Sequence, residues 1–227
     1  ISPSDILHEM EDLETLEKSI SIMRDMGFII QEGKYAYKDE TGYGTTAKHK
    51  ADDINDMFKN ENVKAIFAIT GGNNSISTFE YLDWEAIKQN PKIICGFSDT
   101  TSLLNEINEK TGLVTFMGPS FKSIASGETD YRFKAVLDRF VKGKDNLFYE
   151  EDLDEIRIIR EGQAEGKFIG GNLALTTDLI SGKYKINFKI FVISFCSSSN
   201  TGSKKKHLYK SMKNSNMINF DPQKSKN

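Results

Sequence analysis

Val63-Lys-Ala-Ile-Phe-Ala-Ile-Thr70, followed by Gly71-Gly-Asn-Asn-Ser75, is the stretch that decides the fold class of this chain. A second apolar run, Lys92-Ile-Ile-Cys-Gly-Phe97, ends directly at Ser98 and Asp99. Both runs are short, nearly continuous and partly β-branched, which is typical of strands buried on both faces of a parallel sheet. Helical patterns lie between them and after them. The sequence therefore predicts an α/β fold, with an N-terminal parallel-sheet domain and flanking helices.

The other elements are predicted from the spacing of apolar residues. Helices are expected over 12–26, 45–59, 75–89, 101–110 and 130–142, and further short strands over 28–30 and 113–117. A later segment, Gly166-Lys-Phe-Ile-Gly-Gly-Asn-Leu173, opens a second unit with a helix that ends near residue 180.

Composition excludes several classes of protein. With 38% hydrophobic and 11% aromatic residues, the 227-residue chain is typical of a globular protein rather than a disordered one. The formal net charge of -3 gives no basic footprint, so no nucleic-acid partner is expected. The sequence contains no apolar run of the roughly 18 residues that a membrane span needs. The N-terminus lacks a signal-peptide pattern, so we expect no membrane association and a cytoplasmic protein.

The two cysteines, Cys95 and Cys196, lie far apart in the sequence. They make no disulfide framework, and no Cys/His cluster predicts a metal site. We expect neither a metal nor a cofactor.

Candidate chemistry gathers where the two buried strands end. Ligands of open parallel sheets bind at the carboxyl ends of the strands, which here carry the loops 71–75 and 96–100. The second loop is a strand–Ser–helix turn, which can expose the Ser98 hydroxyl as a nucleophile. The backbone N–H groups of Gly72 and Asp99 could form an oxyanion hole, and glycine at 71 and 72 would let the backbone approach a substrate.

Other interpretations of the same residues stay open at this point. Gly96-Phe-Ser-Asp99 lacks the second glycine of a nucleophile elbow, and Ser-Asp after a strand is also an ordinary helix start. The Gly-Gly turn is equally compatible with a phosphate or nucleotide site.

Four motifs together resemble one enzyme family. They are Val63–Ser75 with Phe79-Glu-Tyr-Leu-Asp83, Asn90-Pro-Lys-Ile-Ile-Cys-Gly-Phe-Ser-Asp-Thr-Thr101, Thr111-Gly-Leu-Val-Thr-Phe-Met-Gly-Pro119 and Gly166–Leu173. Their order and spacing resemble the LD-carboxypeptidase and microcin C immunity family of serine peptidases over roughly residues 1–182. The Gly-Gly-Asn-Asn-Ser loop is more similar to the microcin-immunity branch.

The resemblance implies a Ser–His–Glu triad with Ser98 as the nucleophile. Beside it, we expect the oxyanion hole from Gly72 and Asp99 and substrate binding by Gly71 and Asn73. It implies a small substrate: a murein peptide or a peptidyl or aminoacyl nucleotide, cut at an amide next to a free carboxylate. No metal is implied, and a homodimer is an expectation because family members are often dimers.

The resemblance also divides the chain. Residues 1–145 are expected to form the N-terminal α/β nucleophile domain, and 146–196 a linker and part of an incomplete smaller C-terminal domain. Residues 197–227, with seven lysines and one acidic residue, are expected to be a disordered tail.

The sequence departs from the family after residue 182. Lys189-Ile-Phe-Val-Ile-Ser194 places Ser194 where the family has its catalytic Glu. The histidine of the tail, His207, lacks the family's glycine-flanked setting, and His8 and His49 lie in the region that does not supply the base. Three hypotheses follow: a serine carboxypeptidase-type hydrolase that has lost activity or retains it, a non-catalytic module that binds a small peptide or nucleotide, and a truncated gene product without function.

Overall fold

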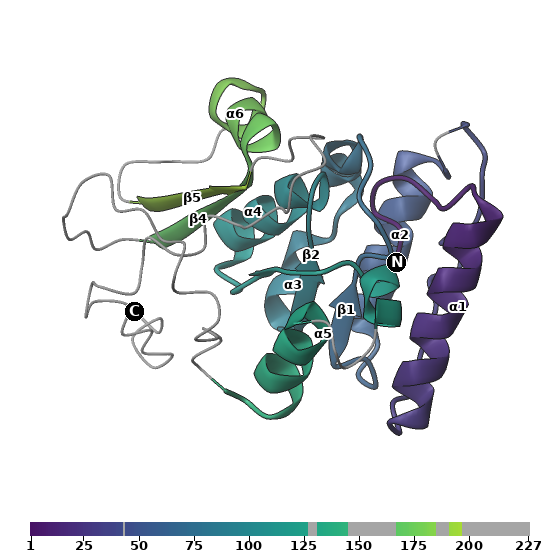
Figure 1. The fold of residues 1–227 in the computed structure, drawn as a ribbon. Coiled ribbons are helices and arrows are strands. Elements are labelled where there is room, and N and C mark those ends of the chain that lie inside the picture. Colours follow the sequence, from purple (N-terminus) through teal and green to yellow (C-terminus); the bar gives the residue numbers. More distant parts are fainter. Residues whose placement is uncertain (43, 127–130, 145–166, 185–190, 197–227) are drawn as a thin grey trace.

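The central sheet of the computed structural model has three parallel strands (Figure 1). The structure describes residues 1–42, 44–126, 131–144, 167–184 and 191–196. Strands β1 (Ala65–Phe67), β2 (Ile93–Gly96) and β3 (Phe116–Met117) lie in the order β1-β2-β3. Both neighbouring pairs are parallel. All three strands therefore end at the same edge of the sheet.

The first residues of the chain run along the free side of β1. The Ile69 N–H donates to the Ile1 carbonyl at 2.9 Å, and the Asp5 N–H donates to the Gly71 carbonyl at 3.3 Å. This segment therefore reaches the loop that follows β1.

Helices and 3-10 segments surround the sheet, and α5 continues directly into a short π-helix, η3. Their bounds are α1 (Met10–Asp25), α2 (Ala47–Lys59), η1 (Ser75–Tyr81), α3 (Trp84–Gln89), α4 (Thr100–Thr111), η2 (Phe121–Ser126), α5 (Tyr131–Val136) and η3 (Leu137–Val141).

The sheet separates two hydrophobic cores. Ile66 of β1 and Ile94 of β2 belong to a first core formed with α2, α3 and α4, which contribute buried residues such as Phe58, Ile87 and Leu103. Phe67 packs against a second core formed with α1, η2 and α5. Successive side chains of a strand point to opposite faces, so adjacent residues of β1 serve both cores.

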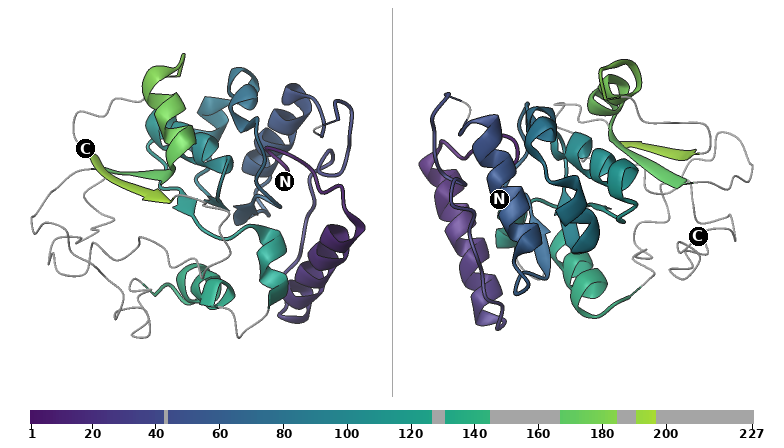
Figure 2. Two further views of the ribbon diagram at one scale, coloured as in Figure 1. Left: turned by 45° about the horizontal axis from the view of Figure 1, so that its top comes forward. Right: turned by 180° about the vertical axis from the view of Figure 1, so that it is seen from behind.

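A second, two-stranded sheet lies beside α4, at the other end of the molecule from α1 (Figures 1 and 2). Strand β4 (Lys167–Asn172) pairs in parallel with β5 (Phe191–Cys196), and α6 (Leu173–Ser181) follows β4. The Asn105 side chain of α4 donates to the Gly170 carbonyl at 3.0 Å, and the Asn172 N–H donates to the Thr101 hydroxyl at 3.1 Å. Strand β4 is thus fixed to the first half of α4.

The predicted α/β class, with a parallel sheet and flanking helices, is confirmed. Two predicted elements are wrong. Residues 28–30 form no strand, because they pair with no neighbouring strand among the described residues, although Phe28 and Ile30 pack on the second core and Ile29 is 96% exposed. The single helix over 75–89 is broken, since Leu82 is extended and the Asp83 side chain caps a new helix by accepting from the Ala86 N–H.

Several predictions fall on residues that the structure does not describe. They are the tail 197–227, His207 and most of the linker that begins at 146. The division into domains at 145 and 196 stays a prediction. Within the described ranges, every helix is too short or too polar to cross a lipid bilayer.

Candidate active site

Ser98 stands at a sharp turn between β2 and α4. It follows the last strand residue, Gly96, by two positions and precedes the first helical residue, Thr100. Among the described residues, Ser98 is the one non-glycine residue with a positive φ, at 57°. A left-handed conformation is unfavourable for a residue with a Cβ atom, so the surrounding structure must hold it in place. Residues in such unfavourable backbone conformations are found preferentially at functional sites.

The Ser98 hydroxyl faces the loop that follows β1. A Cβ atom on Gly71 would lie 2.8 Å from the Ser98 Cβ and 3.1 Å from its Oγ, so only glycine allows this approach. Within the described part of the chain, the Ser98 Oγ forms no hydrogen bond. The hydroxyl is half-buried and has no fixed partner.

Two backbone N–H groups near this turn are also without partners. In the part of the chain that the structure describes, neither the Gly72 nor the Asp99 N–H has a hydrogen-bond acceptor. Gly72 has a φ of 150°, and a Cβ atom there would lie 2.5 Å from the Asp5 nitrogen. Its conformation and its close contact with Asp5 both require glycine.

The Asp99 side chain is buried, being 1% exposed, and joins three segments. Its Oδ2 accepts hydrogen bonds from the Ser4 hydroxyl and, at 2.7 Å, from the Ser75 N–H. The Asp99 carbonyl accepts from the Ser75 hydroxyl at 2.8 Å. The two loops at the edge of the sheet are therefore linked through Asp99.

Lys50 of α2 is the cation of this buried group, and it is 2% exposed. Its ammonium donates to the Ser4 carbonyl and, at 2.7 Å, to the Asn74 Oδ1. Burial lowers the pKa of Lys50, while the charges of Asp5 and Asp99 act in the opposite direction. The negative charges of Asp5 and Asp99, which Lys50 does not directly contact, therefore partly offset the cost of burying the charged ammonium.

Asn73 lies at the exposed tip of the first loop. Its amide donates to the Asp5 Oδ2 at 3.3 Å, which ties the tip to the N-terminal segment. The other oxygen of Asp5 is buried without a partner among the described residues.

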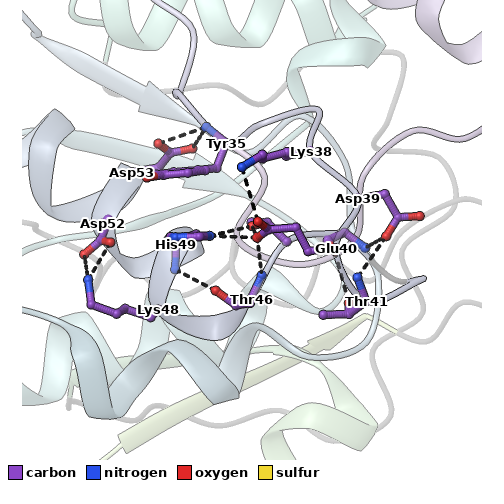
Figure 3. Close-up of polar contacts among 12 residues, drawn as sticks. Tyr35, Lys38, Asp39, Glu40, Thr41, Thr46, Lys48, His49, Asp52 and Asp53 are labelled. Atoms are coloured by element: carbon purple, nitrogen blue, oxygen red, sulfur yellow. Dashed lines mark hydrogen bonds and ion pairs between the residues drawn. The ribbon is translucent and has the colours of Figure 1, made fainter.

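The histidines that the structure describes do not contact Ser98. His8 is exposed, and the His49 ring stacks on Tyr35 with its Nδ1 2.7 Å from the Glu40 Oε2 (Figure 3). A hydrogen bond from the Thr45 side chain, the largest cause, and another from His49 lower the pKa of Glu40 to about 2. Ser194 lies on β5 opposite Gly170 of β4.

The structure therefore places the five sequence-predicted site residues in two neighbouring loops: Gly71, Gly72 and Asn73 after β1, and Ser98 and Asp99 after β2. Sequence reasoning missed Ser4, Asp5 and Lys50. The burial of Lys50 could have been predicted from its position four residues before Ile54, on the apolar face of α2. Among the described residues, no group of three or more His, Cys, Asp and Glu side chains is arranged to hold a metal ion.

A strained serine in a sharp turn between a strand and a helix of an α/β sheet is how α/β-hydrolases present their nucleophile. Comparison with known sequences identifies the family. Residues 1–118 match the family described as the LD-carboxypeptidase N-terminal domain, and the chain belongs to this family.

Relatives from both branches of the family are similar to the chain. The Microcin C7 self-immunity protein MccF of Escherichia coli is 32% identical over 189 residues, covering 71% of this chain and 55% of that protein. A Bacillus subtilis protein named "Probable murein peptide carboxypeptidase" is 29% identical over 178 residues, covering 78% of this chain and 55% of its own length. The chain thus spans little more than half the length of these relatives.

A solved structure supports the same relationship. MccF in complex with glutamyl sulfamoyl guanosine superposes with a TM-score of 0.71 at 26% identity, covering 87% of this chain and 67% of that one.

Proposed function

We propose that this chain carries the nucleophile half of a serine carboxypeptidase active site, with Ser98 as the nucleophile. The observation that supports this most strongly is the conformation of Ser98, a non-glycine residue with a φ of 57° whose hydroxyl lies against Gly71 and has no partner among the described residues. A serine that only starts a helix would use its side chain as a cap and would need no left-handed backbone.

In the proposed reaction the Ser98 Oγ attacks the carbonyl carbon of an amide next to a free carboxylate. The developing oxyanion accepts hydrogen bonds from the N–H groups of Gly72 and Asp99, neither of which has an acceptor among the described residues. The C–N bond then breaks, the amine leaves with a proton, and an acyl group remains on Ser98. Water releases the acid and restores the hydroxyl. Gly71 and Asn73 line the side on which the substrate would lie.

The serine proton needs a base, and the part of the chain that the structure describes brings no histidine to Ser98. This observation favours a second candidate function, in which the same two loops bind a small peptide or nucleotide without cleaving it. A hydroxyl without a base is a poor nucleophile at neutral pH, so the two functions differ in turnover and share a binding site.

We propose two substrate classes, each taken from a relative. Murein LD-peptides correspond to the Bacillus subtilis relative. Aminoacyl nucleotides with an acidic residue correspond to MccF, which has been solved with glutamyl sulfamoyl guanosine. The Gly-Gly-Asn-Asn-Ser form of the first loop favours the second class.

The test is hydrolysis of an LD-tetrapeptide and of a glutamyl sulfamoyl adenylate, with Ser98→Ala as the control. Turnover that disappears in Ser98→Ala supports the hydrolase. A well-folded chain that is thermally stabilised by either compound but does not cleave it supports the binding module instead. Neither turnover nor stabilisation would overturn both.

A cytoplasmic location and a homodimer remain proposals that rest on the resemblance and on the cysteine pattern. Cell fractionation tests the location, and light scattering of the purified chain tests the dimer. A monodisperse monomer would overturn the homodimer.

A further inference from the structure

The buried side chains around Asp99 connect the two loops of the candidate site at several points. Asp99 binds Ser75 twice, through its carboxylate to the Ser75 N–H at 2.7 Å and through its carbonyl to the Ser75 hydroxyl at 2.8 Å. These bonds span 24 residues of sequence and fix where the first loop ends. Asp99 also carries a backbone N–H that has no acceptor among the described residues.

Lys50 holds the first loop from the opposite side. Its ammonium bonds the Asn74 side chain at 2.7 Å and the Ser4 carbonyl. Ser4 in turn donates its hydroxyl to the Asp99 carboxylate. A closed circuit therefore runs from Lys50 through Ser4 and Asp99 to Ser75 and back to Lys50 through Asn74.

The N-terminal segment supports the middle of the loop. The Asp5 N–H donates to the Gly71 carbonyl, and there is no room for a Cβ atom between Gly72 and Asp5. Asp5 therefore restricts the position of the Gly72 backbone on one side. This restriction fixes the direction of the Gly72 N–H as long as Lys50 holds the Ser4–Asp5 segment in place.

The charges in this group depend on one another. Asp99 and Asp5 each have a buried carboxylate oxygen without a partner among the described residues. Lys50 is the buried cation that interacts with both. A buried carboxylate is costly without a compensating charge, so loss of Lys50 would favour movement of the Asp99 side chain toward solvent. That movement would release the Ser75 N–H.

We propose that Lys50 and Asp99 are positioning residues, which hold the Gly72 and Asp99 backbone N–H groups at a fixed separation beside Ser98. This inference rests on the proposed function, in which those two N–H groups stabilise an oxyanion. Lys50 does not contact the reacting atoms. It acts through Ser4, Asn74 and the charge of Asp99.

Amide hydrogen exchange tests the positioning role without requiring activity. In Lys50→Met and Asp99→Asn, exchange of the Ser75 N–H should accelerate at least about tenfold, while amides in the middle of α4 keep their rates. Lys48→Met is the matched control, because Lys48 lies on the same helix with its ammonium bound to Asp52 at the surface. Unchanged exchange at Ser75, or an equal increase throughout the chain, would overturn the proposal.

A milder variant covers the case in which these two substitutions prevent folding. Ser4→Ala removes one donor to Asp99 and leaves all charges in place. It should also accelerate exchange at Ser75, by a smaller factor. A folded Ser4→Ala protein with parental exchange at Ser75 would count against the circuit.

The reaction of Ser98 with a fluorophosphonate probe gives the second measurement. If the parent chain reacts, Lys50→Met should lower the rate constant by about 10²-fold, the effect of losing one oxyanion donor, while Lys48→Met stays at the parental rate. A parental rate in a folded Lys50→Met chain would overturn the link to catalysis. If the parent chain does not react, the proposed function fails, and the exchange data still decide whether Lys50 and Asp99 hold the loops.

Discussion

At the scale of single residues, the strain at Ser98 leads to a prediction about stability. A left-handed conformation costs a residue with a Cβ atom roughly 1–2 kcal/mol more than glycine. We expect Ser98→Gly to be more stable than Ser98→Ala by about 1 kcal/mol, measured by urea denaturation. At Ser77, which has an ordinary backbone conformation, the alanine variant should be the more stable of the two. If the alanine variant is the more stable of the two at position 98 as well, Ser98 is not strained.

A second prediction concerns Cys95, which lies on β2 under the site and is fully buried. Burial raises the pKa of its thiol to about 12, so the neutral form is favoured in the folded chain. In a Cys196→Ala background, where Cys95 is the remaining thiol, modification by DTNB should stay slow from pH 7 to pH 10. The thiolate is the form that reacts with DTNB. In the unfolded chain, the modification rate should therefore rise with pH as for a free cysteine and level off above a pH of about 9.

The denatured protein at each pH serves as the control for reagent reactivity. Equal modification rates for folded and unfolded chains would contradict the burial of Cys95 and would place β2 closer to solvent.

The sequence predicted the residues of the two loops because they follow buried parallel strands directly, and such strands end at one edge of the sheet. It did not predict Lys50, since lysines at helical spacing are normally placed at the surface. The bonds of Lys50 go to Ser4 and Asn74, which are far from it in the sequence. Only the three-dimensional arrangement shows that these partners exist.

At the scale of elements, the contact between β4 and α4 depends on Gly171. Its φ is 131°, and a Cβ atom there would lie 2.6 Å from the Thr101 Cγ2. Gly171→Ala should therefore cost backbone strain and a steric clash, about 2–4 kcal/mol in the free energy of unfolding. Gly112→Ala is the control, because Gly112 also has a positive φ, 75°, but open space around it.

Chemical denaturation of both variants measures the difference. Gly112→Ala should lose only about 1–2 kcal/mol. If the two variants lose the same amount, β4 is not packed closely on the start of α4.

Elements were predicted well where apolar residues repeat over several turns, as in α1, α2 and α4. The helix over 75–89 was wrong because an apolar repeat does not reveal a local capping bond. Asp83 accepts from the Ala86 N–H at 3.0 Å and restarts the chain as a new helix. The composition of residues 28–30 predicts a strand, but a strand also needs a neighbour to pair with, and composition does not reveal one.

At the scale of the whole molecule, the two cores share the same sheet and should unfold together. Trp84 is the single tryptophan and packs against the first core, so its fluorescence reports on that side. Phe133 is 1% exposed in the second core. We expect Phe133→Ala to lower stability by about 3–5 kcal/mol and to shift the Trp84 transition by the same amount as the far-UV circular dichroism transition.

Leu103→Ala, in the first core, is the matched variant and should shift both signals equally as well. If Phe133→Ala moves the circular dichroism signal and leaves the Trp84 transition in place, the two sides of the sheet unfold independently.

The circuit around Asp99 also has a consequence for how the protein is made. Its bonds join segments from distant parts of the chain, and Ser4 and Asp99 are 95 residues apart. At roughly 5–20 residues per second, a ribosome finishes α1 and α2 several seconds before it adds Asp99. Closing such long loops is slow compared with forming helices. A nascent chain therefore forms its first helices well before the bonds around Asp99 can close, and the backbone beside Ser98 is fixed only after β2 and the start of α4 have been made.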